Sequence, residues 1–475
     1  MALKGEIESL TLLSQPPHRR FIDPFDDLKV SSALSTRSDV AHLLRRAGFG
    51  PTRNVLDAAV ASGFDTTLAG LLDFSGSDPA DAFLPPAMEW YPADLLSAGP
   101  GQQATLVARR EQFIHEQQKS FPDLVAWWLQ RMLTSAHPLR EKLALHLHNN
   151  FATAISKVRL PLLMYDQNQI LRTMGNGNFE TLTQALAKDP AMMVWLDTSS
   201  DKAQHPNENF ARELMERFTM GVGNYTQSDV EQGARGFTGW TIDRMTGQYS
   251  FNPHQFDSGV KTYLGQTGNF TGEDIVHMAT NSEASHRWVA SRLWSFFAYP
   301  VSTDDPVVVN DLVPLYAQQL NLADLLDAIF RHPGFTSSQA KTGLVKQPVE
   351  WMVGAFGALG LSFSASVGKR AVGALRLLAQ VPMDPPNVGG WPQNQYWLST
   401  ASSLSRWRIA EELVKLGDIS LVDETSSSDR PDAVATMLGI TDGWSKSSAA
   451  ALKDVSADPV QITALALVSP EYVSN

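Results

Sequence analysis

The segment from Asn207 to Glu216 brings two amides, three carboxylates and a guanidinium together in ten residues of the chain. Carboxylates on one helix face can bind a metal ion or transfer protons, and a guanidinium can stabilise negative charge. At ~100° per residue, Glu213 and Glu216 share a face of the predicted helix. Glu208 and Arg212 lie one turn apart and can pair. Three interpretations stay open: a solvated helix face with salt bridges, a cleft with metal ligands or acid–base groups, and a buried polar network.

A second group of reactive residue types is the segment from His146 to Thr153, near the end of a helix that begins at Pro138. Residues two apart on a helix point in different directions, so His146 and His148 cannot both face one ion. His148 is the site candidate. The alternative is a histidine that packs in the core or caps the helix.

A third group lies in a stretch without helical periodicity, where His254, Asp257 and Lys261 follow one another closely. A histidine, a carboxylate and an ammonium group at this spacing supply a base, an orienting group and a cation. Asp257-Ser-Gly259 is also ordinary turn chemistry, so a purely structural loop is the alternative.

A fourth group is the loop from Asp384 to Leu398, which contains Gly389-Gly390 and the aromatic residues Trp391, Tyr396 and Trp397. Such a rigid, aromatic loop either covers the edge of a core or binds an apolar or sugar-like ligand.

Helical periodicity predicts the elements that position these groups, so we expect a mainly α, multi-helical fold of two packed lobes. The alternation around Thr246-Gly247 predicts one small β-hairpin near 241–251. The expected organisation is a tail or strap over 1–34, an N-terminal helical lobe over 35–240, a hairpin and motif loop over 241–265, and a C-terminal helical lobe over 266–475.

Composition excludes several classes of protein. The chain has 475 residues, no cysteine and a formal net charge of -12. A cysteine-free chain has no disulfides or thiolate sites, and an acidic one is a poor binder of nucleic acid or anionic membranes. We see no signal peptide and no run of eighteen apolar residues, which predicts a soluble cytoplasmic protein without a membrane span.

The four groups, in this order, resemble the bacterial domain-of-unknown-function family 1800 over about residues 36–475. The resemblance is carried by the segments Arg45-Arg46-Ala47, His148-Asn-Asn-Phe-Ala152, Pro206–Glu216, Tyr225–Trp240, Asp257–Lys261 and Pro386–Trp391. It implies an exported or envelope-associated protein whose gene lies beside that of a sulfatase-like protein of family 1501. That protein is the expected partner.

Two departures from the family pattern bear on a metal site. Asn150 stands where the family has a second histidine, and Phe256 stands where it has another, with His254 two residues earlier. Asparagine is a weak substitute for an imidazole ligand and phenylalanine is none. A divalent metal held by His148, Glu213, Glu216 and His254 would therefore lack two of the family's imidazoles, and the site would be partly degenerate.

Two functions follow as alternatives. In the first, the polar groups fix a binding or assembly surface for an envelope-associated partner. In the second, the chain is a metal-assisted, hydrolase-type enzyme, in which Lys261 or Arg212 stabilises negative charge. Its cleft would contain His148, Glu208, Glu213, Asp257 and Lys261.

Overall fold

The computed structural model describes residues 36–97, 99 and 101–474. The predicted tail over 1–34 lies outside the described residues.

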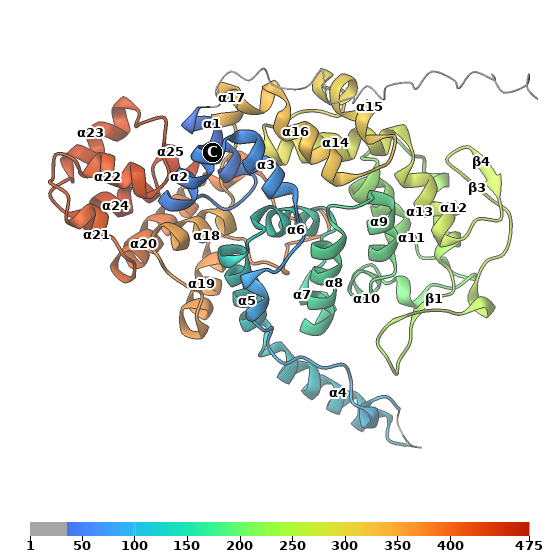
Figure 1. Cartoon of the computed structure of the whole chain (residues 1–475). Helices are drawn as coiled ribbons and strands as arrows, with labels where there is room; N and C mark the ends of the chain where they lie inside the picture. The colour runs from blue at the N-terminus through green and yellow to red at the C-terminus, as the bar shows by residue number, and fades with distance from the viewer. Residues whose placement is uncertain (1–35, 98, 100, 475) are drawn as a thin grey trace, which may run out of the picture.

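The described chain is mainly helical, as the periodicity predicts (Figure 1). The helices before the first strand are α1 (Arg37–Arg46), α2 (Arg53–Ser62), α3 (Phe64–Leu72), α4 (Gln103–Gln118), α5 (Phe121–Thr134), α6 (Pro138–Asn150), α7 (Ile155–Val158), α8 (Pro161–Met174), α9 (Phe179–Ala187), α10 (Pro190–Trp195), α11 (Glu208–Glu213) and α12 (Gln227–Phe237). Those after the last strand are α13 (Gly272–Thr280), α14 (Glu283–Phe297), α15 (Val313–Tyr316), α16 (Leu322–Arg331), α17 (Ser338–Thr342), α18 (Pro348–Ala358), α19 (Ala365–Leu377), α20 (Thr400–Leu416), α21 (Ser420–Asp423), α22 (Arg430–Met437), α23 (Lys446–Asp454), α24 (Pro459–Leu467) and α25 (Pro470–Val473).

The predicted hairpin is confirmed as β1 (Trp240–Ile242) paired antiparallel with β2 (Tyr249–Phe251). A second hairpin, β3 (Lys261–Tyr263) with β4 (Gln266–Gly268), follows it and was not predicted. Its strands are three residues long, too short for a period-2 pattern to stand out from the surrounding loop.

Local sequence signals explain where several helices begin. Proline lies in the first turn of α5 and of α6, where it displaces no helical hydrogen bond. Thr226 and Asp229 form a capping box at the start of α12. No single described helix is long and apolar enough to cross a membrane, and the bent pair α2–α3 meets that test only when both are counted together.

The buried apolar side chains form one connected cluster that runs from Val40 to Val473. Figure 1 shows the two hairpins beside α12 and α13 at one end of the molecule, α20–α24 at the other, and α4 projecting from the body. How this body divides into the two lobes of 35–240 and 266–475 stays a prediction.

The two ends of the described chain meet near α18. The segment before α18 bonds to the last helix, since the Lys346 amide donates to the Val473 carbonyl over 2.8 Å. The Arg45 guanidinium at the end of α1 donates to the Gly439 carbonyl over 3.1 Å. Residues from the beginning, middle and end of the sequence therefore line the same region.

Candidate functional site

The segment from Asn207 to Glu216, which we call the signature segment, begins as the α-helix α11 and continues into a turn of π-helix. The Asn207 side chain caps the start of α11 by accepting from the Asn209 amide over 2.9 Å, and a π-helical turn, Leu214–Thr219, follows the last α-helical residue. The apolar stripe through Phe210, Leu214 and Phe218 is fully buried. Single π turns occur often at functional sites.

Glu208 and Arg212 lie on the surface of this segment. They form an ion pair of 2.8 Å in which both side chains stay more than a third exposed. The Gln227 amide donates to the same Glu208 carboxylate over 3.0 Å. The arrangement is a local, solvated salt bridge, which contributes little to stability.

Glu213 and Glu216 lie deeper. Glu216 accepts from the Tyr225 hydroxyl over 2.8 Å, and burial together with this carboxylate raises the pKa of Tyr225 to about 12. One oxygen of Glu213 is buried and accepts no hydrogen bond. Burial first, and then the charge of Glu216, raise the pKa of Glu213.

His148 is a buried hydrogen-bond acceptor. Its Nε2 accepts from the Met383 amide over 3.1 Å, and its ring packs edge-on against Trp128 and Trp391. Burial lowers its pKa to about 3, so the ring is neutral at pH 7. His146 points elsewhere, with its ring centroid 4.5 Å from that of Phe296, which fits the helical geometry.

The three residues of the third group, His254, Asp257 and Lys261, differ in burial and in their partners. Asp257 forms a bidentate pair with Arg235, whose Nε lies 2.7 Å from the carboxylate. Lys261 is fully buried, and its ammonium donates to the carbonyls of Asp257 and Gly259 over 2.6 and 3.1 Å. His254 is exposed.

The predicted site residues therefore occupy several places. Glu213 and Glu216 are electrostatic neighbours. Asp257 and Lys261 meet through a carbonyl and lie beside α12, which itself packs on α11. His148 bonds to a different loop altogether. Within the part of the chain that the structure describes, no three His, Cys, Asp or Glu side chains gather as a metal-binding group.

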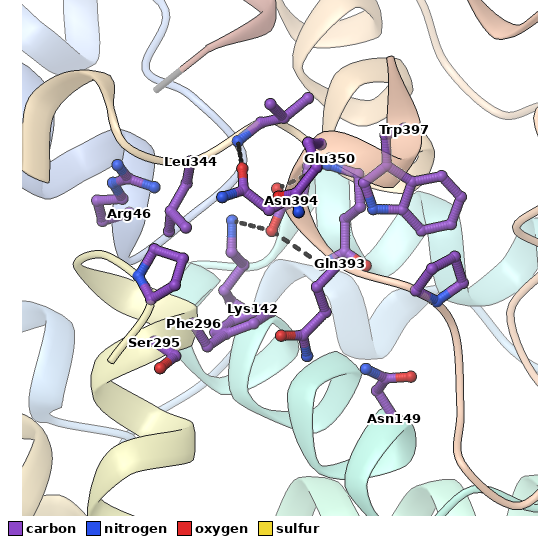
Figure 2. A pocket seen from close by; sticks show the side chains of 15 residues that line it. Arg46, Lys142, Asn149, Ser295, Phe296, Leu344, Glu350, Gln393, Asn394 and Trp397 are labelled. Carbon is purple, nitrogen blue, oxygen red and sulfur yellow. Dashed lines mark hydrogen bonds and ion pairs between the residues drawn. The ribbon is translucent and has the colours of Figure 1, made fainter. Parts of the chain in front are cut away.

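A pocket of about 190 Å³ lies elsewhere, where the ends of the chain meet (Figure 2). Its lining comes from α1, α6, α14, α18 and the loops that follow α14, α17 and α19: Arg46, Lys142, Asn149, Ser295, Phe296, Pro300, Leu344, Val345, Gln347, Glu350, Pro392, Gln393, Asn394, Gln395 and Trp397.

A buried ion pair lies in this lining. The Lys142 ammonium lies 2.7 Å from the Glu350 carboxylate and donates to the Gly48 carbonyl over 2.8 Å. Burial lowers the pKa of Lys142 against the opposing charge of Glu350. Burial alone would raise the pKa of Glu350, but Lys142 and Arg46 hold it below its ordinary value. The Glu350 carboxylate is therefore ionised near neutral pH, with the Lys142 amino group directly against it.

Further cations surround this pair. Arg46 is buried, donates to the Ala340 carbonyl, and has its pKa lowered to about 9 by burial. Arg406 is buried and donates to the carbonyls of Trp397 and Lys346 over 3.0 and 3.1 Å. The Lys346 ammonium lies 3.7 Å from the centre of the Tyr472 ring. Among the described lining residues, Glu350 is the one carboxylate against Lys142 and Arg46.

The aromatic loop from Asp384 to Leu398 forms one wall of the pocket, and a side chain of α6 bonds to its backbone. The Asn149 side chain accepts from the Trp391 amide over 2.6 Å. Gly390 has a φ of 76°, and a Cβ at this position would overlap the same Asn149 side chain. Trp391 and Trp397 are themselves buried, so the loop covers the core, as one of the two sequence-based alternatives proposed.

Sequence reasoning missed most of this pocket. The Arg45-Arg46 doublet and the Asn149 side chain both lie in segments that carry the family resemblance, and both were visible as signals. Lys142 and Glu350 belong to no motif. Their pairing depends on the packing of both α6 and α18 on α5, which local sequence patterns do not encode.

Comparison with known proteins gives one match. A family model described as a protein of unknown function (DUF1800) matches residues 42–474. No curated protein matches the chain, and no solved structure does. Because the family model spans nearly all of the sequence, the chain belongs to the DUF1800 family.

Proposed function

We propose that the protein is a binding protein, and that its pocket between α1, α6, α18 and the Trp391–Trp397 loop takes a small anionic ligand. The observation that supports this proposal is a buried ammonium in the lining. Lys142 contacts the Glu350 carboxylate and the Gly48 carbonyl and keeps a third hydrogen-bond donor at the pocket.

Buried charge is costly unless it is compensated. Glu350 compensates Lys142 through direct contact. The Lys142 ammonium has three N–H donors, and the Glu350 carboxylate and the Gly48 carbonyl take two of them, which leaves one donor for a bound anion. The pocket is then a preformed site for one anionic group.

Acetate binding, measured by calorimetry on the full chain, tests this proposal. Glu350→Gln removes the carboxylate that repels a bound anion. A unit charge ~6 Å away is worth ~3 kcal/mol at an effective dielectric constant of ~20, so affinity should rise about a hundredfold. The double variant Lys142→Met/Glu350→Gln leaves neither partner of the pair unmatched, and it should bind more weakly than Glu350→Gln alone.

Lys157→Met is the matched control, because Lys157 is exposed, pairs with Asp197 and lies outside the pocket lining. It should leave acetate affinity unchanged. Equal acetate affinity in the wild-type chain, Glu350→Gln and the double variant would contradict the proposed site.

The partner suggested by the family resemblance stays a prediction, as does the compartment. Co-expression with the neighbouring family-1501 protein, followed by size-exclusion chromatography, tests the assembly role. Co-elution of the two chains is the expected result, and separate elution at micromolar concentration would argue against it.

The metal-assisted enzyme is the second candidate, and one observation favours it. Glu213 has a buried carboxylate oxygen that accepts no hydrogen bond and lies 4.0 Å from Arg217, and its pKa is raised by burial and by Glu216, which is the setting of a general acid–base group. Titration of the full chain with Mn²⁺ or Zn²⁺ tests it. Saturable binding that Glu213→Gln and Glu216→Gln both weaken would support this candidate.

A further inference from the structure

A second pocket, of about 490 Å³, lies between the helices α2, α3, α5 and α18, and we call it the α2–α3 pocket. Its volume falls within the range of ~300–1,000 Å³ that is usual for small-molecule sites, whereas the pocket beside Lys142 is smaller, at about 190 Å³. The two pockets share no lining residue. The α2–α3 pocket is therefore a separate site, and its ligand does not depend on the proposed anion site.

One face of α2 borders this pocket in place of another helix. A surface helix packs its residues at i, i+3, i+4 and i+7 on the core of the protein. In α2 such a stripe lines the pocket, and it consists of Val55, Ala58, Ala59 and Ser62. Only Leu56 of the ten residues of α2 is buried, and Val55 is 50% exposed. The stripe that would ordinarily pack on the protein body therefore faces the pocket.

The lining of the α2–α3 pocket carries no charge. None of its twenty described residues is Asp, Glu, Lys, Arg or His, although 19% of the residues in the chain are charged. The acids of the two helices have partners outside the pocket, since Asp57 pairs with Arg37 over 2.6 Å and Asp65 pairs with Arg331 over 2.6 Å. An ionised ligand would lose its hydration here without gaining a counterion. The pocket therefore favours a neutral ligand.

The hydroxyl groups of the lining are largely engaged with the protein. The hydroxyls of Ser62, Thr67 and Ser135 donate to protein acceptors over 3.0, 2.8 and 2.7 Å, and a hydroxyl has only one proton to donate. Among the described lining residues Phe49 is the one aromatic side chain, and the rest of the wall is made of small and aliphatic groups. A sugar or a planar aromatic ligand gains few directed contacts on such a wall, whereas an alkyl chain needs none.

The volume sets the length of that chain. At ~30 Å³ for each water-sized group, 490 Å³ has room for about sixteen such groups. An alkyl chain of about ten carbons with a hydroxyl head fits this space.

We infer that the α2–α3 pocket binds a neutral aliphatic molecule of the fatty-alcohol class. Its chain lies along Val55, Ala58 and Ala59 and completes the packing of α2. Removal of the chain and of this stripe from water supplies the affinity.

Calorimetric titration of the full chain with 1-decanol and with decanoate at pH 8 tests this inference, because the two molecules share a chain and only decanoate is ionised. We expect decanol to bind with a negative heat-capacity change, which marks the burial of apolar surface. Decanoate should bind at least about tenfold more weakly. Gly70→Leu fills the pocket from α3, because Gly70 lines it and a Cβ added there meets nothing within 4 Å. This variant should weaken decanol binding at least about tenfold.

Gly373→Leu is the matched control. Gly373 is also an exposed glycine inside a helix, α19, with open space around an added Cβ, but it lies outside the pocket lining. It should leave decanol affinity unchanged. Both changes place leucine where a helix has glycine, so the thermal unfolding midpoint should stay equal or rise. Gly357→Leu, on α18, is a second blocking variant, and its Cβ meets only the Leu133 side chain, at 3.5 Å.

Failure of decanol to bind the wild-type chain would overturn the inference, and so would an unchanged decanol affinity in both blocking variants. Decanoate that binds as tightly as decanol would overturn the preference for a neutral ligand. A dimer in sedimentation equilibrium that Gly70→Leu dissociates would assign the pocket to a second copy of the chain in place of an alcohol. None of these results changes the expectation for acetate beside Lys142, so the two sites are tested separately.

Discussion

Asp201, just before α11, should make stability fall as pH rises from ~4 to about 7. Its carboxyl group is 2% exposed. One oxygen accepts from the Asn207 amide over 2.7 Å, and the other accepts nothing. Burial raises the pKa of Asp201 from 3.8 to about 7, and the two backbone hydrogen bonds it receives only partly oppose this.

The sign follows from the two pKa values. Below pH ~4 the carboxyl group is protonated in both the folded and the unfolded chain, so its full contribution to stability is present. Between pH ~4 and 7 the unfolded chain loses its proton and the folded chain keeps it, so stability falls by ~1.4 kcal/mol for each pH step. The total loss is about 4 kcal/mol and is complete once the pH passes the folded value near 7.

Asp201→Asn removes this titration and keeps an oxygen for the Asn207 amide. The variant should be more stable than the wild-type chain at pH 8. At pH 4 it should be equal or slightly less stable, since the new amide nitrogen has no acceptor. Urea unfolding at pH 4, 6 and 8 measures both. Asp197→Asn, an exposed residue four positions earlier that pairs with Lys157, is the control for the change in net charge. The same pH dependence in wild type and Asp201→Asn would refute the reasoning.

Three further changes test other parts of the structure. His148→Phe leaves the buried Met383 amide without its acceptor and should cost about 1–3 kcal/mol in urea unfolding at pH 8. Burial lowers the pKa of His148 from 6.5 to about 3, so at pH 5 the wild-type histidine is protonated in the unfolded chain and neutral in the folded one, and the loss should be ~2 kcal/mol smaller at pH 5 than at pH 8. Gly390→Ala combines a positive φ with an overlap onto Asn149, and should destabilise by more than the ~1 kcal/mol expected for Gly265→Ala, where φ is 78° but the space is open; equal losses would argue against the overlap. Glu213→Gln removes a carboxyl group whose pKa is raised, so it should be neutral or stabilising at pH 8, and a large loss in differential scanning calorimetry would instead mark Glu213 as part of a structural network.

The sequence predicted those features of the fold that depend on residues a few positions apart in the chain. The start of α11 follows from the cap at Asn207, and the first hairpin follows from Thr246-Gly247, since both signals act over a few residues. The pocket was not predictable in the same way. Lys142 and Glu350 are ordinary charged residues on separate helices, and only the packing of both helices on α5 brings them together.

His148, a site candidate from the sequence, is a buried side chain in the structure. A histidine beside two asparagines suggests chemistry when its surroundings are unknown, because its ordinary pKa lies near neutrality. Two tryptophan rings and the end of α6 remove it from water, and its free nitrogen accepts a backbone amide. Burial cannot be read from its immediate neighbours in sequence.

The two family segments at His148-Asn149 and Pro386–Trp391 act on each other. His148 bonds to the Met383 amide just before the loop, and Asn149 bonds to the Trp391 amide within it. Gly390 lacks the Cβ that would block the second contact. The polar residues of the first segment therefore hold the loop from Met383 to Trp391 against α6, and the chain continues from this loop into the pocket wall at Pro392.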